Sequence, residues 1–235
     1  MNKPAFSFDG VERQTGPEPT WAVIWLHGLG ADGHDFEPIV PELVRPDWPA
    51  MRFVFPHAPV QPVSINNGMR MRSWFDIVGF APDSPQDEAG IRASVALVET
   101  LIARENARGI PAENIVLAGF SQGGAVVLNA GLRHAAPLAG IVALSTYLPL
   151  AEKLPAEASA ANREIPIFMA HGSHDPVVAL ARAVASRDFL QQAGYAIQWH
   201  QYPMPHSVCA EEIVDLAAWF AQRFSAASPQ PPHQA

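Results

Sequence analysis

The amino-acid sequence predicts a single α/β domain in which a mostly parallel sheet carries helices on both faces. Two observations lead to this prediction. Short, nearly continuous apolar runs recur along the chain, as is typical of strands that are buried on both faces. Segments with helical periodicity separate these runs, and strands that alternate with helices indicate βαβ units with right-handed crossovers.

Six apolar runs are predicted strands, and the first four are nearly continuous. They cover residues 22–26, 52–55, 115–119, 141–144, 167–170 and 197–202. Apolar residues recur on one face of four further segments, which we predict to be helices. These cover residues 86–106, 122–134, 177–193 and 209–224.

The chain shows no internal repeat and no obvious linker between domains. Pro- and Ala-rich segments at 56–62 and 149–161 are expected to be connections within one domain. Residues 1–224 are therefore expected to form that domain. Residues 225–235 (SAASPQPPHQA) combine proline with small and polar residues, and we expect a disordered tail.

Composition and charge exclude several classes of function. The formal net charge of the 235 residues is −8, and no run of Lys and Arg offsets it, so nucleic-acid binding is not expected. Cys209 is the single cysteine, which leaves no internal disulfide. The N-terminus lacks the apolar core of a signal peptide, and the apolar runs are too short to span a bilayer. We expect a cytoplasmic protein without stable membrane insertion.

A serine between two glycines interrupts the apolar stretch IVLAGFSQGGAVVL at residues 115–128. Gly119, Ser121 and Gly123 match the pattern G-x-S-x-G, with a predicted strand before it and a predicted helix after it. Such a turn holds the serine at positive φ and brings strand and helix so close that glycine is needed on either side. Ser121 as a plain N-cap is the alternative, although an N-cap does not require both glycines.

A nucleophilic serine requires a base, and the base requires a carboxylate that orients it. Downstream of Ser121, Asp175 follows a predicted strand in HGSHDPVV, and His206 follows another in YPMPHSV. The carboxyl ends of parallel strands meet at one edge of a sheet, which is where such sheets bind ligands. The sequence therefore predicts that Ser121, Asp175 and His206 converge there as a catalytic triad.

The other histidines are assigned from their context. His171 and His174 flank Asp175, but they lack the spacing of a zinc motif, and no metal site is predicted. His57 is expected to form a hydrogen bond within its loop. His134 is expected on the surface.

A second informative stretch is VIWLHGLGADGHDF, in which a predicted strand is followed by a glycine-rich turn. Gly28 and Gly30 allow the backbone to approach a reacting carbonyl closely. We expect the N–H groups of Leu29 and Gln122 to form an oxyanion hole. His27 is expected to form structural hydrogen bonds beneath this turn.

Six blocks of the chain together resemble the phospholipase/carboxylesterase family, from about residue 21 to residue 224. The blocks are VIWLHGLGADG, PVSINNGMRMRSWFDI, LAGFSQGGAVVL, ALSTYLP, HGSHDPVV and YPMPHSV. The resemblance implies a compact α/β-hydrolase without a large cap domain, acting on carboxylic esters and in some members on thioesters or lysophospholipids. It places the triad and the oxyanion donors on the same residues. Arg70, Arg72 and Pro205 depart from what we expect of the family, but none belongs to the triad.

The predicted activity is that of a carboxylesterase, which forms an acyl-enzyme with a small-molecule ester of short to medium acyl length. Met71, Trp74, Leu148 and Val177 are candidate substrate-binding residues, with simple packing an equal alternative for Trp74. No cofactor is expected. An acyl-protein or acyl-CoA thioesterase, a lysophospholipase and a non-catalytic binding protein on a hydrolase fold are the alternatives, and a homodimer is left open.

Overall fold

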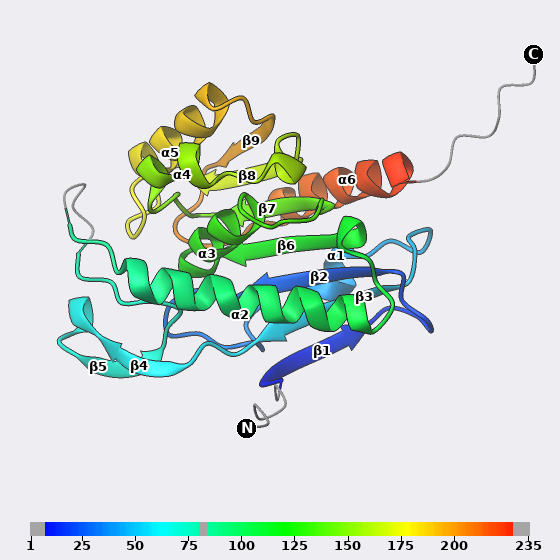
Figure 1. Cartoon of the computed structure of the whole chain (residues 1–235), viewed down its shortest axis with the longest axis horizontal. Helices are drawn as coiled ribbons and strands as arrows, with labels where there is room; N and C mark the ends of the chain where they lie inside the picture. Colours follow the sequence, from blue (N-terminus) through cyan, green and yellow to red (C-terminus); the bar gives the residue numbers. More distant parts are fainter. Residues whose placement is uncertain (1–7, 80–83, 228–235) are drawn as a thin grey trace, which may run out of the picture.

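The structure is a computed structural model that describes residues 8–79 and 84–227. In these residues a seven-stranded sheet has the order β1-β3-β2-β6-β7-β8-β9 (Figure 1). Its first strand is antiparallel to β3, and the others are parallel. The strands are β1 (Gly10–Gln14), β2 (Trp21–Leu26), β3 (Met51–Pro56), β6 (Ile115–Phe120), β7 (Gly140–Leu144), β8 (Ile167–Gly172) and β9 (Ile197–Tyr202).

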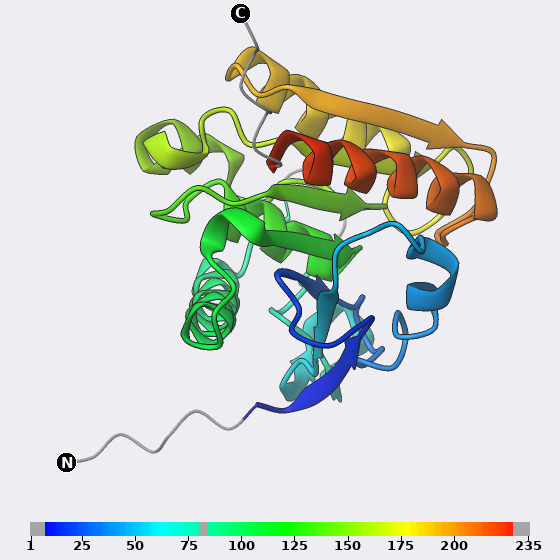
Figure 2. The ribbon, with the colours of Figure 1, turned by 90° about the vertical axis from the view of Figure 1, so that its right-hand side faces the viewer.

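Helices cover both faces of the sheet, as predicted, and Figure 2 shows α2 and α6 on opposite sides of it. One face carries α1 (Ile39–Leu43) and α6 (Ala210–Ala227). The other carries α2 (Glu88–Ala107), α3 (Gln122–Gly131) and α5 (Leu180–Gln192). The predicted α/β class is therefore confirmed.

Only small elements interrupt this layered pattern within the described residues, and none of them forms a cap domain. The strands β4 (Val60–Val63) and β5 (Met69–Arg72) form an antiparallel hairpin outside the main sheet. The segment after β7 contains α4 (Leu154–Glu157) between short 3-10 turns. No described helix is long and apolar enough to cross a membrane.

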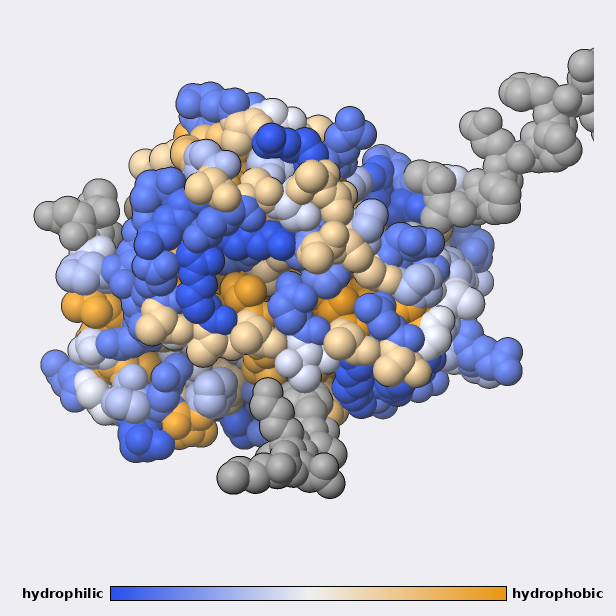
Figure 3. Space-filling model, in the orientation of Figure 1, coloured by the Kyte–Doolittle hydropathy of each residue, from blue (hydrophilic) through white to orange (hydrophobic). Residues whose placement is uncertain are grey.

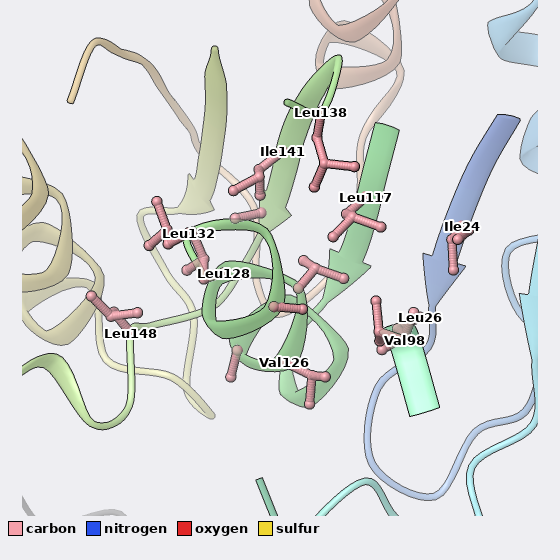
Figure 4. Packing of buried hydrophobic residues seen from close by; sticks show 14 of the residues in the cluster. Ile24, Leu26, Val98, Leu117, Val126, Leu128, Leu132, Leu138, Ile141 and Leu148 are labelled. Atoms are coloured by element: carbon pink, nitrogen blue, oxygen red, sulfur yellow. The ribbon is translucent and has the colours of Figure 1, made fainter. Parts of the chain in front are cut away.

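The hydrophobic core consists of two layers, one on each side of the sheet. Along β6, Ile115 and Leu117 face the layer beneath α2 and α3, and Val116 and Ala118 face the layer beneath α6. Figure 4 shows Leu117 of β6 and Leu128 of α3, which both belong to the first layer. The alternation explains why these strands are apolar throughout, since both of their faces are buried.

Some elements and one histidine differ from the sequence-based expectations. The polar edge strand β1, the short α1 and the β4–β5 hairpin were not predicted. His134 was expected on the surface, but it is buried, and its Nδ1 lies 2.8 Å from a carboxylate oxygen of Glu99. Helix α6 continues to Ala227, three residues past the expected domain boundary, and residues 228–235 lie outside the described part.

Ion pairs connect α2 to α4 on the outside of the molecule. Glu157 accepts from Arg92 at 2.6 Å and from the Nε of Arg133 at 2.7 Å, while Glu88 pairs with Lys153 at 2.6 Å. Figure 3 shows hydrophilic side chains gathered over this region. The hydrogen bond from Arg92 is the main cause that lowers the pKa of Glu157 to about 2. The carboxylate is therefore charged at neutral pH.

A buried carboxylate joins α2 to the sheet. Glu105 is 0% exposed, and it accepts from Arg52 of β3 at 2.7 Å, from Arg108 at 2.9 Å and from Arg104 at 3.0 Å. The Arg52 side chain is itself buried. Loss of Glu105 would leave the buried charge of Arg52 without compensation, and this is strongly destabilising.

We expect Glu105→Gln to lower the free energy of unfolding by about 3 kcal/mol, because Arg52 then stays buried without an anionic partner. Urea denaturation followed by circular dichroism would measure the change. Glu113→Gln, on an exposed side chain, is the matched control and should change stability by no more than about 0.5 kcal/mol. Equal stability of both variants would contradict the structural role of Glu105.

Candidate active site

Ser121 occupies a strained turn between β6 and α3. Its φ is 53° and its ψ is −120°, a conformation that non-glycine residues rarely adopt. A Cβ atom added to Gly119 would lie 2.5 Å from the backbone of Gly123, and one added to Gly123 would lie 2.3 Å from the carbonyl oxygen of Leu26. Both glycines are therefore required by close backbone contacts, as the sequence predicted.

The neighbouring strand β7 fixes the backbone of Ser121. Its N–H donates to the carbonyl of Leu144 at 2.9 Å, and its carbonyl accepts from the hydroxyl of Thr146 at 2.6 Å. The Ser121 residue is 9% exposed at the carboxyl edge of the sheet. The strained turn is thus held by hydrogen bonds on both sides of the serine.

Asp175 and His206, from the loops after β8 and β9, form a short hydrogen bond. The Nδ1 atom of His206 lies 2.6 Å from Oδ2 of Asp175. The other carboxylate oxygen accepts from the N–H groups of Val177 at 2.8 Å and Val178 at 2.9 Å. Both oxygens of Asp175 are therefore engaged, and its side chain is fully buried.

Main-chain contacts hold these two loops together beside Ser121. The N–H of Ser173 donates to the carbonyl of Tyr202 at 2.8 Å, and that of His174 donates to Met204 at 3.1 Å. The ring centroid of His206 lies 4.7 Å from that of Phe120, the residue before Ser121. The structure therefore brings the three residues of the predicted triad to one edge of the sheet.

His171 supports Asp175 from below, a role that the sequence analysis missed. The histidine is fully buried, and its Nε2 donates to the carbonyl of Val178 at 2.8 Å and lies 3.4 Å from Oδ2 of Asp175. Burial lowers its pKa. In the part of the chain that the structure describes, no three His, Cys, Asp or Glu side chains are grouped so that they could hold a metal ion.

The glycine-rich turn after β2 lies next to the serine. A Cβ atom added to Gly28 would lie 3.5 Å from the Cβ of Ser121, so the two backbones are in close contact. Gly30 has a φ of +80°, and its N–H donates to the carbonyl of Arg72 at 2.8 Å. Leu29 lies between these two glycines, on a turn that is adjacent to Ser121.

Gln122 anchors the turn through its side chain, whereas the sequence analysis considered only its N–H. The Oε1 atom accepts from the N–H of Trp74 at 2.9 Å, and Nε2 donates to Ser73 Oγ at 3.0 Å and to the carbonyl of Phe75 at 2.6 Å. Trp74 is 1% exposed, and its indole N–H donates to the carbonyl of His27 at 2.8 Å. Trp74 therefore supports the turn and does not line an open groove.

His27 joins two loops beneath the turn, in agreement with the sequence analysis. Its Nδ1 donates to the carbonyl of Gly28 at 2.7 Å, and its Nε2 accepts from the N–H of Ala58 at 3.1 Å. This pattern requires the neutral ring. Burial is the main cause that lowers the pKa of His27 to about 4. His57 also forms the expected loop contact, since its Nδ1 accepts from the N–H of Gly33 at 2.9 Å.

A groove of about 680 Å³ begins beside Asp175 and runs between α5 and the loop after β7. Leu148 and Val177, two of the candidate substrate-binding residues, line it, and Val177 is 40% exposed. Met71 lies elsewhere, with its sulfur 3.7 Å from the position of a Cβ added to Gly30. Of the four candidate pocket residues, two therefore share this groove.

The fold and this edge of the sheet define an α/β-hydrolase: a strained serine follows a central strand, and a paired aspartate and histidine follow the last two strands. A family model described as phospholipase/carboxylesterase matches residues 11–222. The chain belongs to the phospholipase/carboxylesterase family.

Individual relatives agree with this assignment. Acyl-protein thioesterase 1 of Mycosarcoma maydis is 41% identical over 224 residues, covering 89% of this chain and 93% of that protein. A probable carboxylesterase of Oryza sativa subsp. japonica is 39% identical over 207 residues, covering 87% of this chain and 78% of that protein. Among solved structures, Arabidopsis thaliana SOBER1 has a TM-score of 0.82 at 33% identity, covering 86% of this chain and 98% of that one.

We expect the free energy of unfolding to decrease as the pH falls from about 6.5 to about 4, by up to about 3 kcal/mol from His27 alone. In this range unfolded His27 binds a proton that folded His27 does not bind, so acid favours unfolding. Urea denaturation at several pH values would measure the slope. His27→Gln should reduce the slope, because the buried histidine that binds this proton on unfolding is removed. Equal slopes for wild type and His27→Gln would contradict this account.

Proposed function

We propose that this protein is a serine hydrolase that cleaves carboxylic esters through an acyl-enzyme intermediate. The observation that carries the proposal is the 2.6 Å hydrogen bond between Asp175 and His206, at the sheet edge where Ser121 occupies its strained turn. In the proposed roles, Ser121 is the nucleophile, His206 the general base and Asp175 the group that orients the base.

The hydrogen bond also supports an assignment of the two imidazole nitrogens. Because Nδ1 of His206 donates to Asp175, Nε2 is the nitrogen that takes the proton of the Ser121 hydroxyl during attack. The same nitrogen returns the proton to the departing alcohol, and water then repeats the sequence on the acyl-enzyme. Asp175 stabilises the imidazolium that forms in each step.

The proposed oxyanion hole consists of the N–H groups of Leu29 and Gln122. Support comes from the close contact between Gly28 and Ser121, and from the position of Gln122 as the first residue of α3. A helix N-terminus favours negative charge, and each such donor accelerates acyl transfer by about 10²–10³-fold. The buried side chain of Gln122 holds this part of the backbone in place.

We propose that the groove beside Asp175 binds acyl chains of short to medium length. Leu148, Val177 and Phe189 give it an apolar lining. Thioesters are a second candidate substrate class, because a relative with 41% identity is named acyl-protein thioesterase 1. A small-molecule ester substrate, a homodimer and a cytoplasmic location stay predictions.

Ser121→Ala should lower kcat for p-nitrophenyl butyrate by about 10⁴–10⁶-fold, because the nucleophile is removed while binding remains. Labelling with a fluorophosphonate probe should disappear in the same variant. Ser225→Ala, an exposed serine on α6, is the matched control and should retain both properties. Undiminished turnover after loss of the Ser121 hydroxyl would refute the proposal.

Val177→Trp should lower kcat/KM for p-nitrophenyl octanoate about tenfold more than for p-nitrophenyl acetate, because the larger side chain shortens the groove. Val214→Trp is the matched control, since Val214 is a valine of 60% exposure on α6, outside the groove lining. A parallel loss on both esters would show that this groove does not hold the acyl chain.

A further inference from the structure

The polar side chains that line the groove beside Asp175 differ in whether they already have hydrogen-bond partners. Its described lining includes two charged side chains, Asp175 and Arg182, together with Gln86, Tyr147 and Ser186. Asp175 is fully engaged by His206 and two N–H groups. The hydroxyl of Ser186 is also engaged, since it accepts from the N–H of Leu148 at 2.9 Å and donates to the carbonyl of Arg182 at 2.9 Å. The carboxylate oxygens of Asp175 and the hydroxyl oxygen of Ser186 therefore already accept hydrogen bonds within the protein.

Arg182 presents a charge to this groove from α5. Its guanidinium carbon lies 3.4 Å from the ring centroid of Tyr147, which places the cation on the aromatic face. Within residues 8–79 and 84–227, no carboxylate lies within 4 Å of the guanidinium nitrogens. Arg182 also donates a hydrogen bond to the hydroxyl of Tyr147. Stacking on a ring occupies the face of a guanidinium, and the remaining N–H groups on its edge are able to bind a carboxylate.

Gln86 adds a second donor at the same groove. Its Oε1 accepts from the N–H of Leu150 at 2.8 Å, which fixes the orientation of the amide. Among the described residues, its Nε2 has no hydrogen-bond acceptor. The polar groups that remain for a ligand are thus donors: the Nε2 of Gln86, the remaining N–H groups of Arg182, and the hydroxyl hydrogen of Tyr147, whose oxygen accepts from Arg182. A ligand group that only accepts hydrogen bonds complements all three.

We propose that the groove selects esters whose acyl chain ends in a carboxylate, and that Arg182 binds this carboxylate, with Gln86 as a second donor. The inference rests on the proposed hydrolysis and specifies its substrate class as half-esters of dicarboxylic acids. The apolar wall of Leu148, Val177 and Phe189 accommodates the methylene chain between the two ends. Arg182 is a specificity residue in this account and takes no part in the chemical step.

The test compares p-nitrophenyl half-esters of adipic, pimelic and suberic acid with the same esters capped as methyl esters at the far end. The wild-type protein should prefer the free acid at one chain length. Arg182→Gln should reduce this preference about 10- to 100-fold, because a hydrogen-bonded ion pair is lost. Arg182→Lys should retain part of it. The matched control is Arg187→Gln, because Arg187 also lies on α5 over an aromatic ring, that of Trp199, but does not line the groove.

Two results would overturn the inference: an unchanged preference in Arg182→Gln, or an equal loss on the acid and on the methyl ester. A binding measurement separates it from the proposed function. Titration calorimetry of monomethyl suberate against the Ser121→Ala protein should show binding that weakens about 10- to 100-fold when Arg182→Gln is added. If no ester is hydrolysed but this binding is found, the proposed function fails and the anion site remains. Absent binding, or binding that Arg182→Gln does not weaken, overturns the anion site.

Discussion

The close approach of β6 and α3 is the constraint on which the rest of the site depends. Gly119 has no room for a Cβ atom because the backbone of Gly123 in α3 occupies that volume, and Gly123 has none because the end of β2 occupies it. Ser121 has a positive φ at this turn, and the first turn of α3 lies against the end of β2. Strain of this kind persists only where many surrounding contacts fix the conformation. Here both layers of the core and the hydrogen bonds to Leu144 and Thr146 fix it.

Polar contacts beneath the serine fix the position of the segments that surround the strained turn. The side chain of Gln122 binds the backbone of Trp74 and Phe75, the indole of Trp74 binds the carbonyl of His27, and the His27 ring joins its own loop to Ala58. These contacts connect four parts of the chain, around residues 27, 58, 74 and 122. Because each partner is buried, the loss of any one would leave a polar group without a hydrogen bond. The turn that carries Leu29 is therefore held by a continuous network and not by the glycines alone.

The main strands and helices could be predicted from the sequence, because apolar runs mark strands that are buried on both faces. The meeting of Ser121, Asp175 and His206 could also be predicted, because the carboxyl ends of these parallel strands lie at the same edge of the sheet. The sequence was less informative where the hydrophobic pattern is weak. The edge strand β1 reads GVERQ and is partly exposed, so it lacks an apolar run. The burial of His134 depends on contacts with Glu99 and with Asn162, which are 35 and 28 residues away. Such long-range contacts have no local signal.

The way in which Asp175 is held has a consequence for how related enzymes can diverge. Its Oδ1 is bound by main-chain N–H groups of residues 177 and 178, and not by their side chains. The side chain of Val177 at the groove wall is thus free to vary in size and polarity while the grip on the carboxylate stays the same. In the proposed mechanism, substrate preference and catalytic competence are therefore separable although both are encoded on one short loop. A change of the Val177 side chain can then alter the first without loss of the second.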